Sequence, residues 1–147
     1  MTSIYLYPSL CFFEGTMVSV GRGTDKPFQY VGYPGAPVGE IIFTPIANTG
    51  APNPPHQNKK CRGFDASQYV NDPAQLNKID LQWLILFYNT HKEKDNFFSN
   101  FFNTLAGTKT LKEQIINGIS ELEIRKSWQP DLNKYKEMRK KYLIYEE

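Results

Sequence analysis

Charged side chains are scarce in the first 58 of the 147 residues. That segment has only five of them, which are Glu14, Arg22, Asp25, Lys26 and Glu40. It also holds eight of the ten prolines and seven of the ten glycines. The formal net charge of the whole chain is only +2, so no dense positive surface is available. Because nucleic acids and membrane surfaces usually bind clustered positive charge, we expect neither as a partner.

Patterns typical of metal sites and membrane spans are also missing. The chain has two cysteines, Cys11 and Cys61, and two histidines, without a CxxC or HxxxH motif. We therefore predict no metal site and no cofactor. The cysteines are open to two interpretations, a disulfide or two free thiols. The longest apolar run covers residues 83–88, far below the roughly 20 residues of a membrane helix, and residues 1–5 show no signal-peptide pattern.

The composition and length match one domain over residues 1–147. Short aromatic or β-branched runs bounded by glycine or proline predict strands at 4–7, 10–13, 17–20, 28–31 and 41–44, with one more at 61–65. A proline- and asparagine-rich segment, residues 45–58, predicts a long irregular loop. The expected fold is α+β, with a mainly antiparallel sheet of short strands followed by a helical half.

Helical patterns dominate after residue 72. Asp72 and Pro73 predict the start of a helix whose apolar face runs through Phe87. A second short helix is expected over 97–105, ended near Gly107. Capping-box spacings begin at Thr110 and Ser120. Pro130 predicts the start of the last helix, and an apolar tail at 143–145 is expected to dock on the body.

Two Gly-Thr turns carry the best candidates for chemistry. They are Glu14-Gly15-Thr16 and Gly21-Arg22-Gly23-Thr24, with Ser19 between them. The Glu14 carboxylate suits sugar hydroxyls, and the Arg22 guanidinium suits a carboxylate. A structural ion pair between Glu14 and Arg22 is the other interpretation.

Complete catalytic patterns are absent. Gly21–Gly23 lacks P-loop spacing, no GxSxG serine motif exists, and the loop-rich half has only three acids for a two-carboxylate glycosidase. Some aromatic residues could stack on a sugar or simply pack between strands. These are Tyr5, Tyr7, Phe28, Tyr30, Tyr33 and Phe43.

Longer segments resemble one known family. YPSLCFFEGT at 7–16 and VSVGRGTDKPFQ at 18–29 are similar to the opening of the C-terminal domain of bacterial exo-β-N-acetylmuramidases, once a domain of unknown function. FTP at 43–45, CRGFD at 61–65, IRKSWQPDL at 124–132 and RKKYLIY at 139–145 extend the resemblance, closest to Bacteroidetes-type members.

The resemblance implies a part of a peptidoglycan hydrolase. Family members carry an N-terminal Rossmann-like domain with the principal catalytic glutamate, and the cleft for N-acetylmuramic acid lies between the domains. It implies a periplasmic or secreted parent protein, and an isolated chain without activity. It implies substrate binding by Glu14, Gly15, Thr16, Ser19, Arg22, Gly23 and Thr24. Our own hypothesis is that Arg22 binds the lactyl carboxylate of muramic acid.

Two other functions stay open. One is a non-catalytic module that binds glycan or muropeptide, and the other is a structural domain that dimerises.

Overall fold

The computed structural model describes residues 2–70 and 78–145, which form two compact units. The first unit extends to Lys109 and the second begins at Thr110. The first contains a small sheet with helices beside it, so the α+β prediction is confirmed. Each unit is described by itself below.

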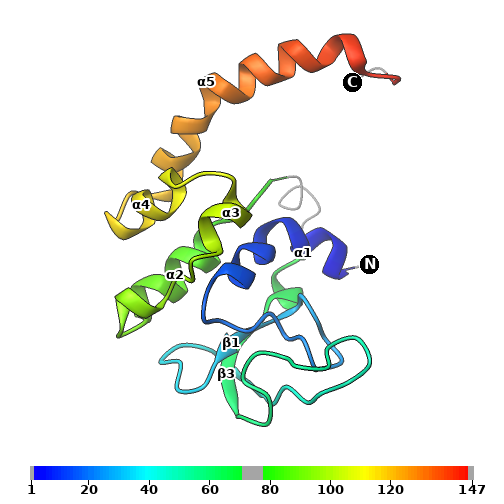
Figure 1. Ribbon diagram of the computed structural model, residues 1–147, viewed down its shortest axis with the longest axis vertical. Coiled ribbons are helices and arrows are strands. Elements are labelled where there is room, and N and C mark those ends of the chain that lie inside the picture. Colours follow the sequence, from blue (N-terminus) through cyan, green and yellow to red (C-terminus); the bar gives the residue numbers. More distant parts are fainter. Residues whose placement is uncertain (1, 71–77, 146–147) are drawn as a thin grey trace. The chain divides into compact units, whose positions relative to one another are not determined.

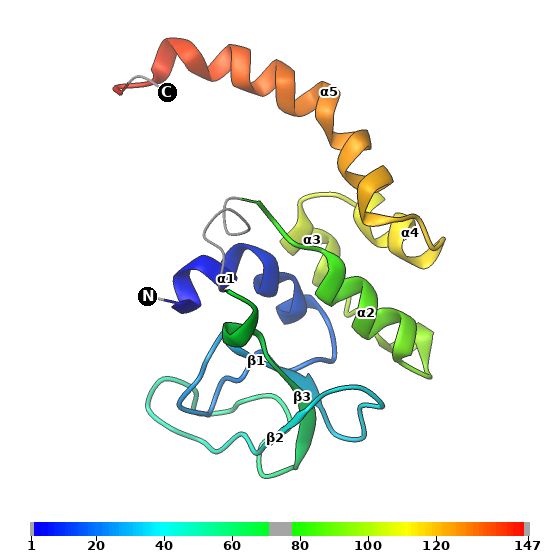
Figure 2. The same ribbon diagram turned by 180° about the vertical axis from the view of Figure 1, so that it is seen from behind.

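The sheet has three antiparallel strands in the order β1-β3-β2, which are β1 (Tyr30–Tyr33), β3 (Cys61–Asp65) and β2 (Ile41–Phe43). Gly32 faces Gly63 across the β1–β3 pair. A Cβ added to Gly63 would lie 1.9 Å from the carbonyl oxygen of Val31, so the central strand requires glycine at this position. The loop between β2 and β3 is irregular, as expected, and extends away from the helices (Figure 2).

The first segment is a helix, so the strands predicted at 4–7 and 10–13 are wrong. Residues in α1 (Thr2–Leu10) continue into the 3-10 helix η1 (Cys11–Gly15). Leu6, Ser9 and Leu10 are its buried residues, and their spacing is helical. Aromatic and β-branched content suggested strands, but burial of one helical face outweighs that preference.

The strand predicted at 61–65 is confirmed as β3, and the strand predicted at 41–44 is β2, one residue shorter, whereas two others are reduced or displaced. Residues 17–20 form only a single bridge, in which Ser19 and Gly32 exchange backbone hydrogen bonds of 2.9 and 3.0 Å. The strand expected at 28–31 is β1, two residues later, which leaves Phe28 in the preceding turn.

Helices α1, α2 and α3 gather beside the sheet (Figure 1). Helix α2 covers Gln82–Thr90, and the Gln82 N–H donates to Asp80 Oδ1 at its start (2.8 Å). The expected start at Asp72 and Pro73 lies outside the described residues. Phe87 of α2 makes edge contacts with Phe13 of η1 and Phe64 of β3, which joins helix and sheet into one core.

The segment after α2 supplies more of this core. It contains the 3-10 helix η4 (Lys94–Asn96) and then α3 (Phe102–Ala106), whereas the 3-10 helix η2 (Ala66–Tyr69) precedes α2. Phe97 and Phe102 are fully buried. Gly107 ends α3 with φ of +70°, so the predicted stop is confirmed, although the helix itself is shorter than expected.

The second unit contains α4 (Thr110–Ile116), α5 (Glu121–Arg139) and the 3-10 helix η5 (Lys140–Tyr142). The capping box of Ser120 with Glu123 is confirmed at the start of α5. Pro130 lies inside α5, so the prediction that it begins the last helix is wrong. The chain tolerates the lost backbone donor there. Ile144 is 90% exposed, so docking of the apolar tail is not seen in this unit.

Candidate functional site

Glu14 and Arg22 form an ion pair on the surface of the first unit. Arg22 Nη2 donates to Glu14 Oε1 over 2.8 Å, which joins the end of η1 to the glycine turn after residue 20. The Arg22 side chain is 42% exposed, so the pair itself contributes little to stability. The pairing predicted as one alternative is therefore formed, and it still leaves much of the guanidinium accessible.

Arg22 also lies against an aromatic ring. Its Cζ is 5.1 Å from the centroid of the Phe28 ring, a cation–π distance. The Phe28 ring in turn lies 4.8 Å from the ring of Tyr7 on α1. We call Tyr7, Glu14, Arg22 and Phe28 the Arg22 cluster. It holds a guanidinium between a carboxylate and a ring, an arrangement able to bind a carboxylate with the remaining donors.

The second Gly-Thr turn is held by its own side chain. Thr24 Oγ1 donates to the Gly21 carbonyl (2.7 Å) and accepts from the Lys26 N–H (3.0 Å). Gly21 and Gly23 have φ of +74° and +82°, which glycine adopts without strain. Gly23 and Thr24 also line an open hollow of about 530 Å³ beside Tyr30 and Asn48.

The proline- and asparagine-rich loop packs onto this turn. The Ile46 N–H donates to the Gly23 carbonyl (2.8 Å), and a Cβ added to Gly23 would lie 2.7 Å from Pro54 Cγ. His56 Nε2 donates to the Met17 carbonyl over 2.7 Å. The loop of residues 45–58 therefore supports the Gly21–Thr24 turn, although the two segments are more than twenty residues apart in sequence.

The other predicted site residues shape the backbone. A Cβ on Gly15 would lie 2.7 Å from the Cα of Phe102, so Gly15 allows α3 to approach. Thr16 Oγ1 donates to the Phe13 carbonyl (2.9 Å). Ser19 is fully buried, and its Oγ accepts from the Gly21 N–H (3.2 Å). Their part in substrate binding stays a prediction.

A buried carboxylate stabilises the sheet beside this site. Asp65 is 6% exposed and accepts from Lys26 Nζ (3.0 Å) and from the hydroxyl and N–H of Ser67. Burial raises the pKa of Asp65, but these hydrogen bonds outweigh it and hold that pKa below its ordinary value. Lys26 Nζ also lies over the Tyr30 ring. The Lys26–Asp65 ion pair therefore ties the end of the Gly21–Lys26 turn to strand β3.

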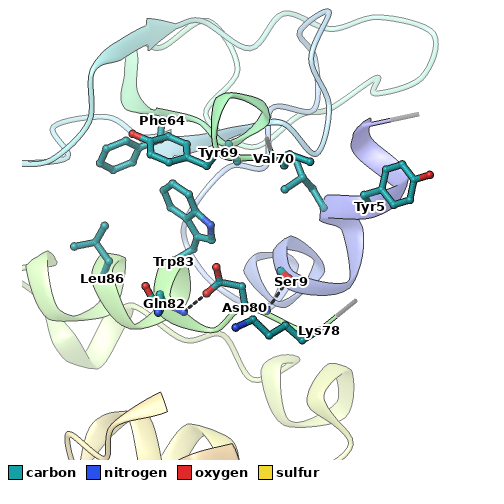
Figure 3. Close-up of a pocket in the computed structure, with 12 residues that line it drawn as sticks. Tyr5, Ser9, Phe64, Tyr69, Val70, Lys78, Asp80, Gln82, Trp83 and Leu86 are labelled. Carbon is teal, nitrogen blue, oxygen red and sulfur yellow. Dashed lines mark hydrogen bonds between the residues drawn. The ribbon is translucent and has the colours of Figure 1, made fainter. Parts of the chain in front are cut away.

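Sequence reasoning missed an aromatic-walled cavity of about 500 Å³ elsewhere in the first unit (Figure 3). Trp83 of α2 contacts Tyr69 and Phe64, with ring centroids 5.1 and 5.4 Å apart. Lys78 and Asp80 lie at its polar edge. The apolar periodicity places Trp83 only on one face of a helix, and the packing of η2 against α2 that forms the wall has no local signal.

The aromatic residues considered as sugar platforms divide between core and surface. Tyr33 and Phe43 are buried, at 4% and 6% exposed, and pack as expected for strands. Tyr5 and Tyr7 on α1 are each 48% exposed. Phe28 and Tyr30 are half-buried, so Tyr5 and Tyr7 are the most exposed of the six.

The cysteines are both free. Burial raises the pKa of the Cys61 thiol to about 11. Within residues 2–70 and 78–145, no three His, Cys, Asp or Glu side chains are grouped to hold a metal ion. No helix in the same ranges is long and apolar enough to cross a membrane.

The molecule is thus an α+β domain with an exposed arginine fixed by a carboxylate and a ring. A family model described as "Exo-beta-N-acetylmuramidase NamZ, C-terminal" matches residues 5–145. The chain therefore belongs to the family of NamZ C-terminal domains.

Two relatives support this assignment. The peptidoglycan beta-N-acetylmuramidase NamZ of Bacillus subtilis is 30% identical over 97% of this chain and 37% of its own length. The crystal structure of a DUF1343 family protein from Bacteroides fragilis matches with a TM-score of 0.93 and 42% identity, over 100% of this chain and 42% of that one. The chain thus spans about two fifths of the length of the relatives it matches.

Proposed function

We propose that this domain lines the substrate cleft of an exo-β-N-acetylmuramidase that releases terminal N-acetylmuramic acid from peptidoglycan fragments. Membership of the NamZ C-terminal family carries the proposal, and the Bacillus subtilis relative has that activity in its name. A Rossmann-like N-terminal domain of the same protein supplies the principal catalytic glutamate in this proposal. A peptidoglycan substrate places such an enzyme in the periplasm or outside the cell.

Arg22 is the residue that we assign to substrate recognition. N-acetylmuramic acid differs from N-acetylglucosamine by a lactyl ether, which carries a carboxylate. Arg22 offers five donors in a fixed fork, and its hydrogen bond to Glu14 uses one nitrogen, Nη2. The guanidinium is also accessible, so a carboxylate can reach it. In this proposal Glu14 orients the Arg22 guanidinium through their hydrogen bond, rather than acting as an acid or base.

The test measures sugar binding in the full-length protein that contains this domain. We expect Arg22→Ala to raise the KM for a muramic acid glycoside at least tenfold, because a lost charge-assisted bond costs roughly 1.5–3 kcal/mol. Arg62→Ala is the matched control, since Arg62 is an exposed arginine on β3 that contacts Gly39. An unchanged KM and kcat in Arg22→Ala would remove Arg22 from the cleft.

The aromatic cavity supports a second candidate function, a module that binds muropeptide without chemistry. Titrating this chain with N-acetylmuramic acid separates the two, with Trp83 fluorescence as the readout. Millimolar or tighter binding that Tyr69→Ala weakens and Arg22→Ala does not favours the module, because Tyr69 lines the same cavity and Trp83 is kept as the reporter. Absence of binding by this chain, combined with the KM effect in the full-length protein, favours a cleft shared with another domain.

A further inference from the structure

Phe28 has a backbone conformation that its side chain disfavours. Its φ is +55°, and among residues 2–70 and 78–145 the other non-glycine residues with positive φ are His56 and Asn58. Histidine and asparagine are the types that tolerate this region, whereas a bulky side chain there is an outlier. Such strain persists where the surroundings impose it, and it concentrates at functional sites.

The surroundings impose this conformation from both sides of Phe28. The Phe28 N–H donates to the Val20 carbonyl (2.7 Å). Ser3 Oγ of α1 donates to the Pro27 carbonyl (2.9 Å) and accepts from Gln29 Nε2 (3.0 Å). One serine therefore fixes both neighbours of Phe28. Glycine would satisfy the same backbone bonds without strain, so the backbone alone gives no reason for phenylalanine.

The ring of Phe28 contacts two side chains. Its centroid lies 4.8 Å from the centroid of the Tyr7 ring and 5.1 Å from Arg22 Cζ. Tyr7 belongs to α1, so the ring transmits the position of that helix to Arg22. Glu14 holds the guanidinium by a hydrogen bond to Nη2, and the ring face restricts its remaining motion.

We propose that Phe28 is a positioning residue, whose strained backbone places its ring so that Arg22 is pre-oriented for the carboxylate of the sugar. The proposal rests on the function proposed for Arg22 and adds a residue to it. Pre-orientation raises affinity because less freedom of the arginine is lost when the carboxylate binds. N-acetylglucosamine lacks that carboxylate, so its binding should not depend on Phe28.

The test compares inhibition constants of the two sugars in the full-length protein. Its readout is the preference for N-acetylmuramic acid over N-acetylglucosamine. We expect Phe28→Ala and Phe28→Gly to lower this preference about two- to fivefold, the range that an exposed cation–π contact supports. Phe28→Tyr keeps a ring and should retain the preference. Arg22→Ala should lower it further, and it serves as the reference.

A stability measurement distinguishes positioning from a general loss of structure. Phe28→Gly relieves the backbone strain and Phe28→Ala does not, so the glycine variant should have the higher Tm. Both should nevertheless lose the same preference. If the less stable Phe28→Ala loses the preference for N-acetylmuramic acid and the more stable Phe28→Gly retains it, the loss reflects stability, and the proposal is overturned.

The two proposals fail in different ways. An unchanged preference in Arg22→Ala contradicts the substrate-binding role proposed for Arg22. A reduced preference in Arg22→Ala, together with an unchanged one in both Phe28→Ala and Phe28→Gly, contradicts only the role of Phe28. In this chain, the Arg22 Nε–H resonance gives a direct check, since the ring current of Phe28 should shift it and Phe28→Ala should remove that shift.

Discussion

Gly23 is the point where the glycine turn meets the long loop, and replacing it tests the packing of the site. A Cβ at this position would lie 2.7 Å from Pro54 Cγ and 2.8 Å from the Ile46 carbonyl oxygen. Carbon atoms in contact normally lie about 3.5–4.0 Å apart. The φ of Gly23 is also +82°, so alanine meets both a collision and a strained backbone.

The magnitude follows from these two effects. A left-handed conformation costs an alanine about 1–2 kcal/mol, and the lower entropy of the unfolded alanine chain offsets about 0.4–1 kcal/mol. Overpacking against Pro54 and Ile46 adds about 1–3 kcal/mol. We therefore expect Gly23→Ala to lower the free energy of unfolding by about 2–4 kcal/mol. The loop should also separate from the turn, which would weaken the support of Arg22.

Gly35 provides the matched control. Its φ is +76°, and a Cβ there would meet no atom within 4 Å. Gly35→Ala thus carries the backbone strain alone and should cost about 1 kcal/mol. Urea denaturation of both variants measures the difference, with Trp128→Phe in the background so that Trp83 reports on the first unit. If Gly23→Ala is no more destabilising than Gly35→Ala, the loop does not pack on Gly23 as described.

The remaining predictions concern the buried polar groups of the sheet. Asp65→Asn should cost about 1–3 kcal/mol at pH 7, because the Lys26 and Ser67 donors lose a charged acceptor. Because the folded pKa of Asp65 is lowered, its stabilisation is full above the ordinary value of 3.8 and disappears as the pH falls through the folded value. Urea melts should show the variant and wild type converging there, and a gap that is constant with pH would contradict this. Cys61, with a pKa of about 11, has about one thiolate in a thousand at pH 8. Alkylation should therefore modify the half-buried Cys11 before Cys61, and the reverse order would contradict the described burial.

Local patterns in the sequence predicted the features that local physics controls. The capping box at Ser120 needs only a hydroxyl and a carboxylate three residues apart, and Gly107 needs only freedom to adopt positive φ. The loop of residues 45–58 was equally visible, since proline and asparagine disfavour regular structure. The ion pair of Glu14 with Arg22 was one of two interpretations, and the structure forms it.

The errors arose where burial outweighed local preference. Residues 2–10 contain aromatic side chains typical of strands, yet Leu6 and Leu10 are buried together on one face of a helix. Pro130 is a common first residue of helices, but here α5 had already begun at a better cap, Ser120. The burial of Leu6 and Leu10 depends on groups outside any local window of sequence, whereas the second error came from giving Pro130 more weight than the local capping box at Ser120.

The sequence by itself determined the α+β class, the scarcity of charge around Glu14 and Arg22, and, through its long first motif, the family. Only the tertiary structure decided which groups meet there. Phe28 reaches Arg22 because Ser3 of α1 holds the two neighbours of Phe28 in the turn, and the loop supports Gly23 through Pro54. The contacts of Ser3 with Pro27 and Gln29, and of Pro54 with Gly23, join segments more than twenty residues apart. Their geometry therefore follows from the packing of the whole first unit rather than from any local pattern.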